Sequence, residues 1–311
     1  MADSTEGYTE FQHNGLLPSA LIALLAGLVI HSFIIASNVY DWWEGRSVTP
    51  VDHIVTSLGI SQMCSQCANT LDLFLGLSFI IRNVRSRVTL LIIDVVYAFF
   101  TGTNVCLTAL LSIVFCLKIS NFHTRLFLYL RRMILQRTVF FIVASVLLSF
   151  FNCLMALSMT LTEVTKDGAY KITSHLFLNC SNINNLYHFS IGCFFPLLFY
   201  YFSSILLFSS LYYHATRMKM NKNVTINLET YYSAMKFVSF TFIYNTVYSI
   251  GHFLCAFYYY LHCVSLPWLF IFLGFLPALH SSYLIYRTAK LRNRMSKVLQ
   301  NVIDFLFQKK D

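Results

Sequence analysis

The sequence carries little charge for its length. Only 11% of its 311 residues are Asp, Glu, Lys or Arg, whereas 57% are hydrophobic. An ordinary soluble domain carries roughly 25% charged residues, which it needs to cover its surface. The shortage argues against a soluble protein and favours one whose surface faces lipid.

The residue patterns that enzymes and metal sites require are also missing. The sequence contains no HExxH, no GxSxG and no glycine loop of the kind that binds phosphate. Its ten histidines lack the spacing of metal ligands, and most of its nine cysteines lie in or beside apolar runs. Only Cys180 and Cys263 fall clearly in predicted outer loops, and a disulfide between them stays open. We therefore expect no enzyme, no cofactor and no metal.

Long apolar blocks are abundant instead. Each is near or above the length of about 20 residues that a helix needs to cross a bilayer. Because a backbone in lipid must satisfy its own polar groups, such continuous runs predict helices. We expect a single all-α domain over residues 1–311, with seven transmembrane spans at about 16–40, 54–80, 90–117, 138–161, 187–213, 234–258 and 266–286.

The basic residues predict the orientation of the chain. Segment 1–15 has no Lys or Arg, whereas the tail 287–311 is rich in both. Most other basic residues fall in loops on the same side as this tail, and the cluster at 82–87 is a local exception. The positive-inside rule then predicts an extracellular amino terminus and a cytoplasmic tail. The net charge of +9 reflects this orientation and contact with membrane lipid; basic residues spread over separate loops do not indicate nucleic-acid binding.

Polar side chains recur at helical spacing in three of the spans. Residues three and four apart share one helix face, and polar groups within a span turn away from lipid. For the deeper members, Gln62, Gln66 and Asn104, we favour interhelical hydrogen bonding over a ligand cavity. For members nearer the outer mouth we favour a ligand cavity, and these are Asp94, Tyr97, Thr101 and Tyr248.

The carboxyl groups of Asp72 and Asp94 allow two interpretations. Both residues lie in the outer halves of neighbouring spans, where an ionised carboxylate needs a partner. Arg82, Arg85 and Arg87, in the short loop that joins these spans, are the nearest candidates. Alternatively, at least one carboxylate stays free to bind cationic ligands.

Several short motifs occur in a characteristic order along the chain. They are Phe33-Ile34, Asn38, Asp41-Trp42 and Asp52–Leu58 around the first loop, Leu110–Phe122 after the third span, Asn179-Cys180-Ser181, Pro196 with Ser210–His214 and Met218, and Pro277–Ser281 with Lys290-Leu291. This set resembles the bitter taste receptors (taste receptor type 2). Asn121-Phe122 stands where a rhodopsin-like receptor would carry DRY, and no NPxxY closes the seventh span.

The resemblance implies a seven-transmembrane-helix G-protein-coupled receptor bundle in the plasma membrane. A small bitter ligand would bind between the outer ends of the spans. The family's pocket positions fall on Tyr97, Thr101, Tyr248 and Phe270, and Asp94 and Asp72 are our additions. A gustducin-like heterotrimeric G protein would bind a cytoplasmic face that includes Lys118, His123, His214, Met218 and Lys236.

Two departures from the family concern its buried polar network. His31 stands where the family usually has Asn, and Gln62 where it usually has Arg. A neutral hydrogen bond between the two would be one replacement for that network. The divergence suggests a distant, non-mammalian branch of the family.

Two alternatives to a bitter taste receptor stay open. One is another seven-helix chemoreceptor of the vomeronasal kind, and the other is a small-solute transporter. Transporters tend to show two related halves with glycine- or proline-broken spans. Here the five prolines fall singly and no second half matches the first, which disfavours a transporter.

The predicted orientation can be tested with two glycosylation sequons, Asn179-Cys-Ser and Asn223-Val-Thr. We expect glycan only on Asn179, because only this asparagine would lie outside. Asn179→Gln should remove the glycosidase-sensitive mass on a gel, and Asn223→Gln should leave it unchanged. The opposite result would mean that the topology is inverted.

Overall fold

The structure is a computed structural model of the chain and describes residues 3–82, 87–120, 124–166, 183–220, 225–262 and 266–308. Outside these ranges lie the sequon asparagines Asn179 and Asn223, the cysteines Cys180 and Cys263, and also Arg85 and His123. The side chains of Arg82 and Arg87 are likewise not described. The glycan, disulfide and arginine-pairing expectations therefore stay predictions.

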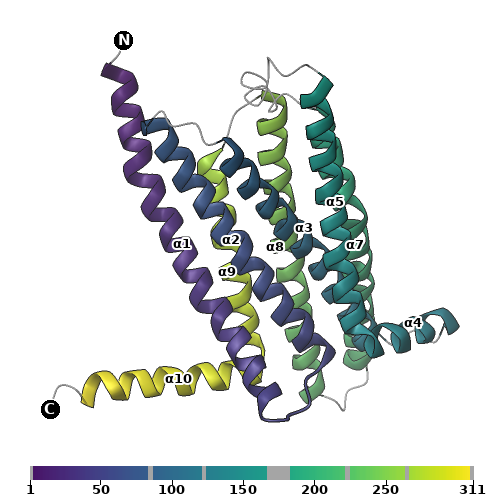
Figure 1. Cartoon of the computed structure of the whole chain (residues 1–311). Helices are drawn as coiled ribbons and strands as arrows, with labels where there is room; N and C mark the ends of the chain where they lie inside the picture. The colour runs from purple at the N-terminus through teal and green to yellow at the C-terminus, as the bar shows by residue number, and fades with distance from the viewer. Residues whose placement is uncertain are drawn as a thin grey trace.

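In the part of the chain that the structure describes, seven long helices stand side by side in one bundle, and each is named by its bounds (Figure 1). They are α1 (Asp3–Trp43), α2 (Pro50–Arg82), α3 (Arg87–Ile119), α5 (Thr138–Lys166), α7 (Ile183–Met220), α8 (Thr225–His262) and α9 (Pro267–Arg287). Helix α3 contacts α2, α5 and α7, and α9 contacts both α1 and α8. The predicted fold class, an all-α bundle of seven helices, is confirmed.

Two shorter helices, α4 (Arg125–Gln136) and α10 (Ala289–Gln308), point outward from one end of this bundle (Figure 1). We call this the α10 end; the amino terminus lies at the opposite end. Both helices expose large apolar side chains such as Leu126 and Phe305 beside arginines and lysines. This combination is typical of a helix that lies in the interface between lipid and water.

Five of the described helical segments are long and apolar enough to cross a membrane. They are Gly15–Trp43, Ile92–Ile119, Thr138–Met159, Gly192–Lys219 and Pro267–Arg287. Helices α2 and α8 complete the bundle with lower hydropathy, because each carries a stripe of buried polar residues. Gln62 and Gln66 belong to the first stripe, and Asn245 and His252 to the second.

The apolar core lies toward the α10 end and joins α1, α2, α3 and α9. Its most deeply buried members include Ile34, Ile54, Leu107 and Val114, and Leu284 completes it from α9. The first turn of α2, which leads into this core, is capped by side-chain hydrogen bonds. The Asp52 carboxylate accepts hydrogen bonds from the Thr49 backbone N–H at 3.0 Å and from its hydroxyl at 2.8 Å. Pro50 follows at the first helical position, where its missing N–H costs nothing.

Gly27 permits a close approach between α1 and α2. A Cβ added at this position would overlap the side-chain amide of Gln66. That amide lies here because its Nε2 donates a 2.8 Å hydrogen bond to the carbonyl oxygen of Gly274 on α9. A single absent methyl group therefore makes room for a polar contact that ties three helices together.

We expect Gly27→Ala to lower the melting temperature of the detergent-solubilised chain by several degrees. The new methyl group displaces Gln66, and losing one buried hydrogen bond costs about 1 kcal/mol or more. Gly102→Ala is the matched control, since its Cβ would lie an ordinary 3.6 Å from the Ser149 hydroxyl. That variant should melt at or slightly above the wild-type temperature, because alanine is the better helix former. Equal melting temperatures for the two variants would contradict the close approach.

Candidate functional site

A cavity of about 370 Å³ lies between α3, α7 and α8. This volume falls within the range of roughly 300–1,000 Å³ that holds drug-sized ligands. Most of the wall is apolar, and α7 contributes five of its eleven residues, while the polar groups come mainly from α3 and α8. The lining residues are Thr101, Val105, Cys193, Phe194, Leu197, Leu198, Tyr201, Tyr248, Ser249, His252 and Phe253.

Helix spacing explains how α8 contributes to this wall. Tyr248 and His252 are four residues apart, so both side chains project from one face, and their rings meet at 4.3 Å between centroids. The Tyr248 ring also stacks on Tyr244 one turn away, at 5.8 Å. Both Tyr248 and His252 are buried. The α8 side of the cavity therefore consists largely of aromatic rings that contact one another along the helix.

Thr101 forms the buried floor on α3 and is held from behind by α2. Only 3% of Thr101 is exposed, and its hydroxyl lies 3.2 Å from that of Ser65. Ser61, one turn along α2, donates a 3.0 Å hydrogen bond to the carbonyl oxygen of Phe100. These contacts fix α3 against α2 at the depth of the cavity.

A second layer of side chains lies next to the cavity, about one helical turn nearer to the end of the bundle that holds the amino terminus. The Tyr97 hydroxyl is 3.3 Å from Nδ1 of His252, and the rings of Tyr97 and Phe270 approach edge to face at 6.3 Å. These residues belong to α3, α8 and α9, which the layer therefore joins. Of the predicted pocket residues, Thr101 and Tyr248 line the cavity, whereas Tyr97 and Phe270 support it from this layer.

The two carboxyl groups lie away from this cavity wall. Asp72 is half-buried on α2, and Asp94 is exposed on the surface of α3. Their role in ligand binding stays a prediction.

The departures from the family pattern occupy different surroundings. The fully buried His31 ring lies 3.2 Å through Nδ1 from the hydroxyl of Ser281 on α9. Gln62 instead lies beside Asn104 and Tyr248, where two small cavities of about 10 Å³ each adjoin the main one. His31 thus links α1 to α9, while Gln62 belongs to the polar surroundings of Tyr248.

Several of the predicted coupling residues meet at the α10 end of the bundle. Lys118 lies in the last turn of α3 and Lys236 lies on α8, and both are exposed. His214 and Met218 are half-buried near the end of α7, where the His214 ring lies 6.3 Å from that of Tyr231 on α8. The helices that carry these residues pack together as α3 with α7 and α7 with α8.

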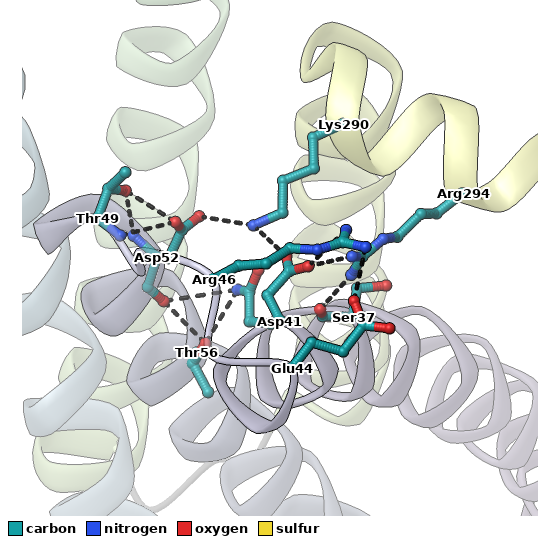
Figure 2. Close-up of polar contacts among 10 residues, drawn as sticks. Ser37, Asp41, Glu44, Arg46, Thr49, Asp52, Thr56, Lys290 and Arg294 are labelled. Atoms are coloured by element: carbon teal, nitrogen blue, oxygen red, sulfur yellow. Dashed lines mark hydrogen bonds and ion pairs between the residues drawn. The ribbon is translucent and has the colours of Figure 1, made fainter.

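A cluster of charged side chains lies at the same end, where α1, α2 and α10 converge (Figure 2). The Asp41 side chain is only 4% exposed and pairs with Lys290 at 2.6 Å, with Arg46 at 3.4 Å and with Arg294. Lys290 also reaches Asp52 at 3.6 Å, and Arg294 donates to the Ser37 carbonyl oxygen. Asp41 therefore anchors the first turns of α10 to the end of α1.

The sequence motifs include Asp41 and Lys290 but indicate neither their pairing nor the role of Arg294. The α7 wall of the cavity was not predicted either. Cys193, Leu197 and Tyr201 recur at four-residue spacing, which predicts a shared face. Apolar residues on a transmembrane helix usually face lipid, however, so this spacing alone does not single out a cavity.

Comparison with known proteins gives a consistent result. The family model described as taste receptor protein (TAS2R) matches residues 11–303. Taste receptor type 2 member 7 from Papio hamadryas is 27% identical over 302 residues, which is 94% of each chain. Member 16 from Rattus norvegicus is 29% identical over 67% of this chain and 69% of its own length. The match to member 16 from Pongo pygmaeus is 33% identical but spans only 35% of each chain.

The charged cluster yields a prediction about stability. Asp41→Asn should lower the melting temperature by several degrees, because it leaves Lys290 and Arg294 without their buried counter-charge, a change that typically costs a few kcal/mol. Glu44→Gln is the matched control, since Glu44 pairs with Arg46, whose side chain is 61% exposed. Exposed pairs contribute about 0–1 kcal/mol, so this control should melt near the wild-type temperature. Similar losses in both variants would show that Asp41 is no special anchor.

Proposed function

We propose that this chain, which belongs to the taste receptor protein (TAS2R) family, is a plasma-membrane receptor for small bitter compounds. It works as one seven-helix domain with an extracellular amino terminus. The cavity between α3, α7 and α8 holds the ligand, and this cavity is the observation that carries the proposal. Its support is that the two family pocket positions Thr101 and Tyr248 both line it.

The proposed signal passes from the cavity to the α10 end through α7 and α8. Both helices line the cavity and continue to the surface that carries His214, Met218 and Lys236. A ligand that changes how α7 packs against α8 therefore changes this surface as well. We propose that a gustducin-like heterotrimeric G protein binds to this surface, and that Lys118 and His123 also belong to its binding site.

The direct test is expression with a promiscuous G protein and measurement of calcium responses to a panel of bitter compounds. A receptor gives saturable responses that depend on the G protein. Saturable uptake of a solute without such responses would instead identify a transporter.

With an agonist from this panel, we expect Tyr248→Ala to raise the half-maximal concentration about tenfold or more. A buried aromatic contact contributes about 1 kcal/mol beyond its area, and 1.4 kcal/mol is tenfold in affinity. Tyr97→Ala should act in the same direction, because it removes the contact that holds His252. Tyr258→Ala, on an exposed part of α8, is the control and should respond as wild type does. Normal responses from both variants at normal surface expression would place the ligand elsewhere.

A further inference from the structure

The cavity extends from the bundle interior to its outer surface. Thr101, Tyr248 and His252 at its inner end are buried. At its outer end, Phe194 is 56% exposed, Leu198 is 51% exposed and Phe253 is 46% exposed. The first two come from α7 and the third from α8. The cavity therefore opens sideways, between these two helices.

The opening lies at a depth where the surroundings are hydrocarbon. Thr101 and Val105 lie about 14 and 20 Å inside the apolar segment Ile92–Ile119, at a rise of about 1.5 Å per residue. The hydrocarbon core of a bilayer is about 30 Å thick. A molecule that enters sideways at this depth comes from among the lipid tails and not from water.

The contacts between the cavity and the predicted extracellular end of the bundle favour entry from the side. The Tyr97–His252 contact spans from α3 to α8 one turn above Thr101 and Tyr248, and Phe270 supports it from α9. A ligand that descended from the outer mouth along these helices would have to separate this layer. The side chains at the lateral opening, in contrast, are all apolar and accept an apolar neighbour without loss of a hydrogen bond.

We infer that the cavity takes uncharged, largely apolar small molecules dissolved in the bilayer, which enter between α7 and α8 past Phe194, Leu198 and Phe253. An ionised ligand is excluded from this route, since moving an unpaired charge through hydrocarbon is very costly. The inner end offers hydroxyl groups of Thr101 and Ser249 and the ring of His252, which suit one hydrogen-bonding group on the ligand. This inference specifies the ligand class of the proposed receptor and rests on that proposal for its signalling role.

The test uses a small photoreactive probe that partitions into lipid, trifluoromethyl-phenyl-diazirine, on the purified full chain in lipid nanodiscs. After illumination, mass spectrometry locates the adducts by residue. We expect adducts on Val105 as well as on exposed surface residues such as Phe202. Leu107, on the same helix but 1% exposed, serves as the internal control and should stay unlabelled. Labelling of Val105 no stronger than that of Leu107 would overturn the inference.

The route is tested by narrowing the opening. Leu198→Trp, and independently Phe253→Trp from the other side, should reduce labelling of Val105 several-fold and leave Phe202 labelled. Both positions are on the outer surface, so the fold should tolerate the larger ring. Ile205→Trp is the matched control, because Ile205 is similarly exposed on α7 but does not line the cavity. Unchanged labelling of Val105 in both narrowed variants would show that the probe enters by another path.

Labelling needs no G protein, so this result is separate from the calcium assay. A chain that is labelled as expected but never signals would keep the lateral route and refute the receptor proposal. A chain that signals while Val105 stays unlabelled would support the receptor proposal and refute the lateral route.

Discussion

The rest of this structure follows from one constraint, namely that hydrocarbon offers no partner to a polar group. With so few charged residues, the chain satisfies this constraint by pairing polar side chains across helices. Gln66 on α2 donates to the Gly274 carbonyl oxygen on α9, and His31 on α1 meets Ser281 on α9. Tyr200 on α7 receives a hydrogen bond from Asn245 on α8 at 3.0 Å. Such contacts fix which helices are neighbours, whereas apolar side chains would pack almost equally well against lipid.

Charge is concentrated where the constraint relaxes, at the α10 end. Among the charged residues that the structure describes, Asp41 is the buried one, and its carboxylate is surrounded by Arg46, Lys290 and Arg294 (Figure 2). The same arrangement fixes the direction in which α10 leaves the bundle. The exposed apolar side chains of α10, together with its lysines and arginines, are typical of a helix that lies along a membrane surface.

The sequence predicts the fold class and the family well, because both depend on features that are local in the chain. Apolar block length identifies the helices, and each short motif that carries the resemblance occupies one stretch of the chain. Helix ends are predicted less well: α8 begins at Thr225, nine residues before the apolar block that predicts it, because hydropathy marks only the part of a helix within lipid. The polar stripes predict which faces turn inward, but not which residues meet. The pairing of Asp41 with Arg294 joins positions 253 residues apart and has no signal at either one.

The cavity, too, could be predicted from the sequence only in part. Thr101 and Tyr248 are polar residues at helical spacing, and so the sequence points to them. Leu198 and Phe253 look like ordinary lipid-facing residues, and only the packing of α7 against α8 makes them a boundary between cavity and bilayer. Tyr248 connects the two descriptions, because its ring borders the main cavity and also the small polar cavities beside Gln62 and Asn104. If the cavity binds a ligand as proposed, a ligand that moves this ring changes both the apolar wall and the space beside Gln62 and Asn104. In the proposed receptor, the residue that contacts the ligand thus also borders buried polar residues of α2 and α3.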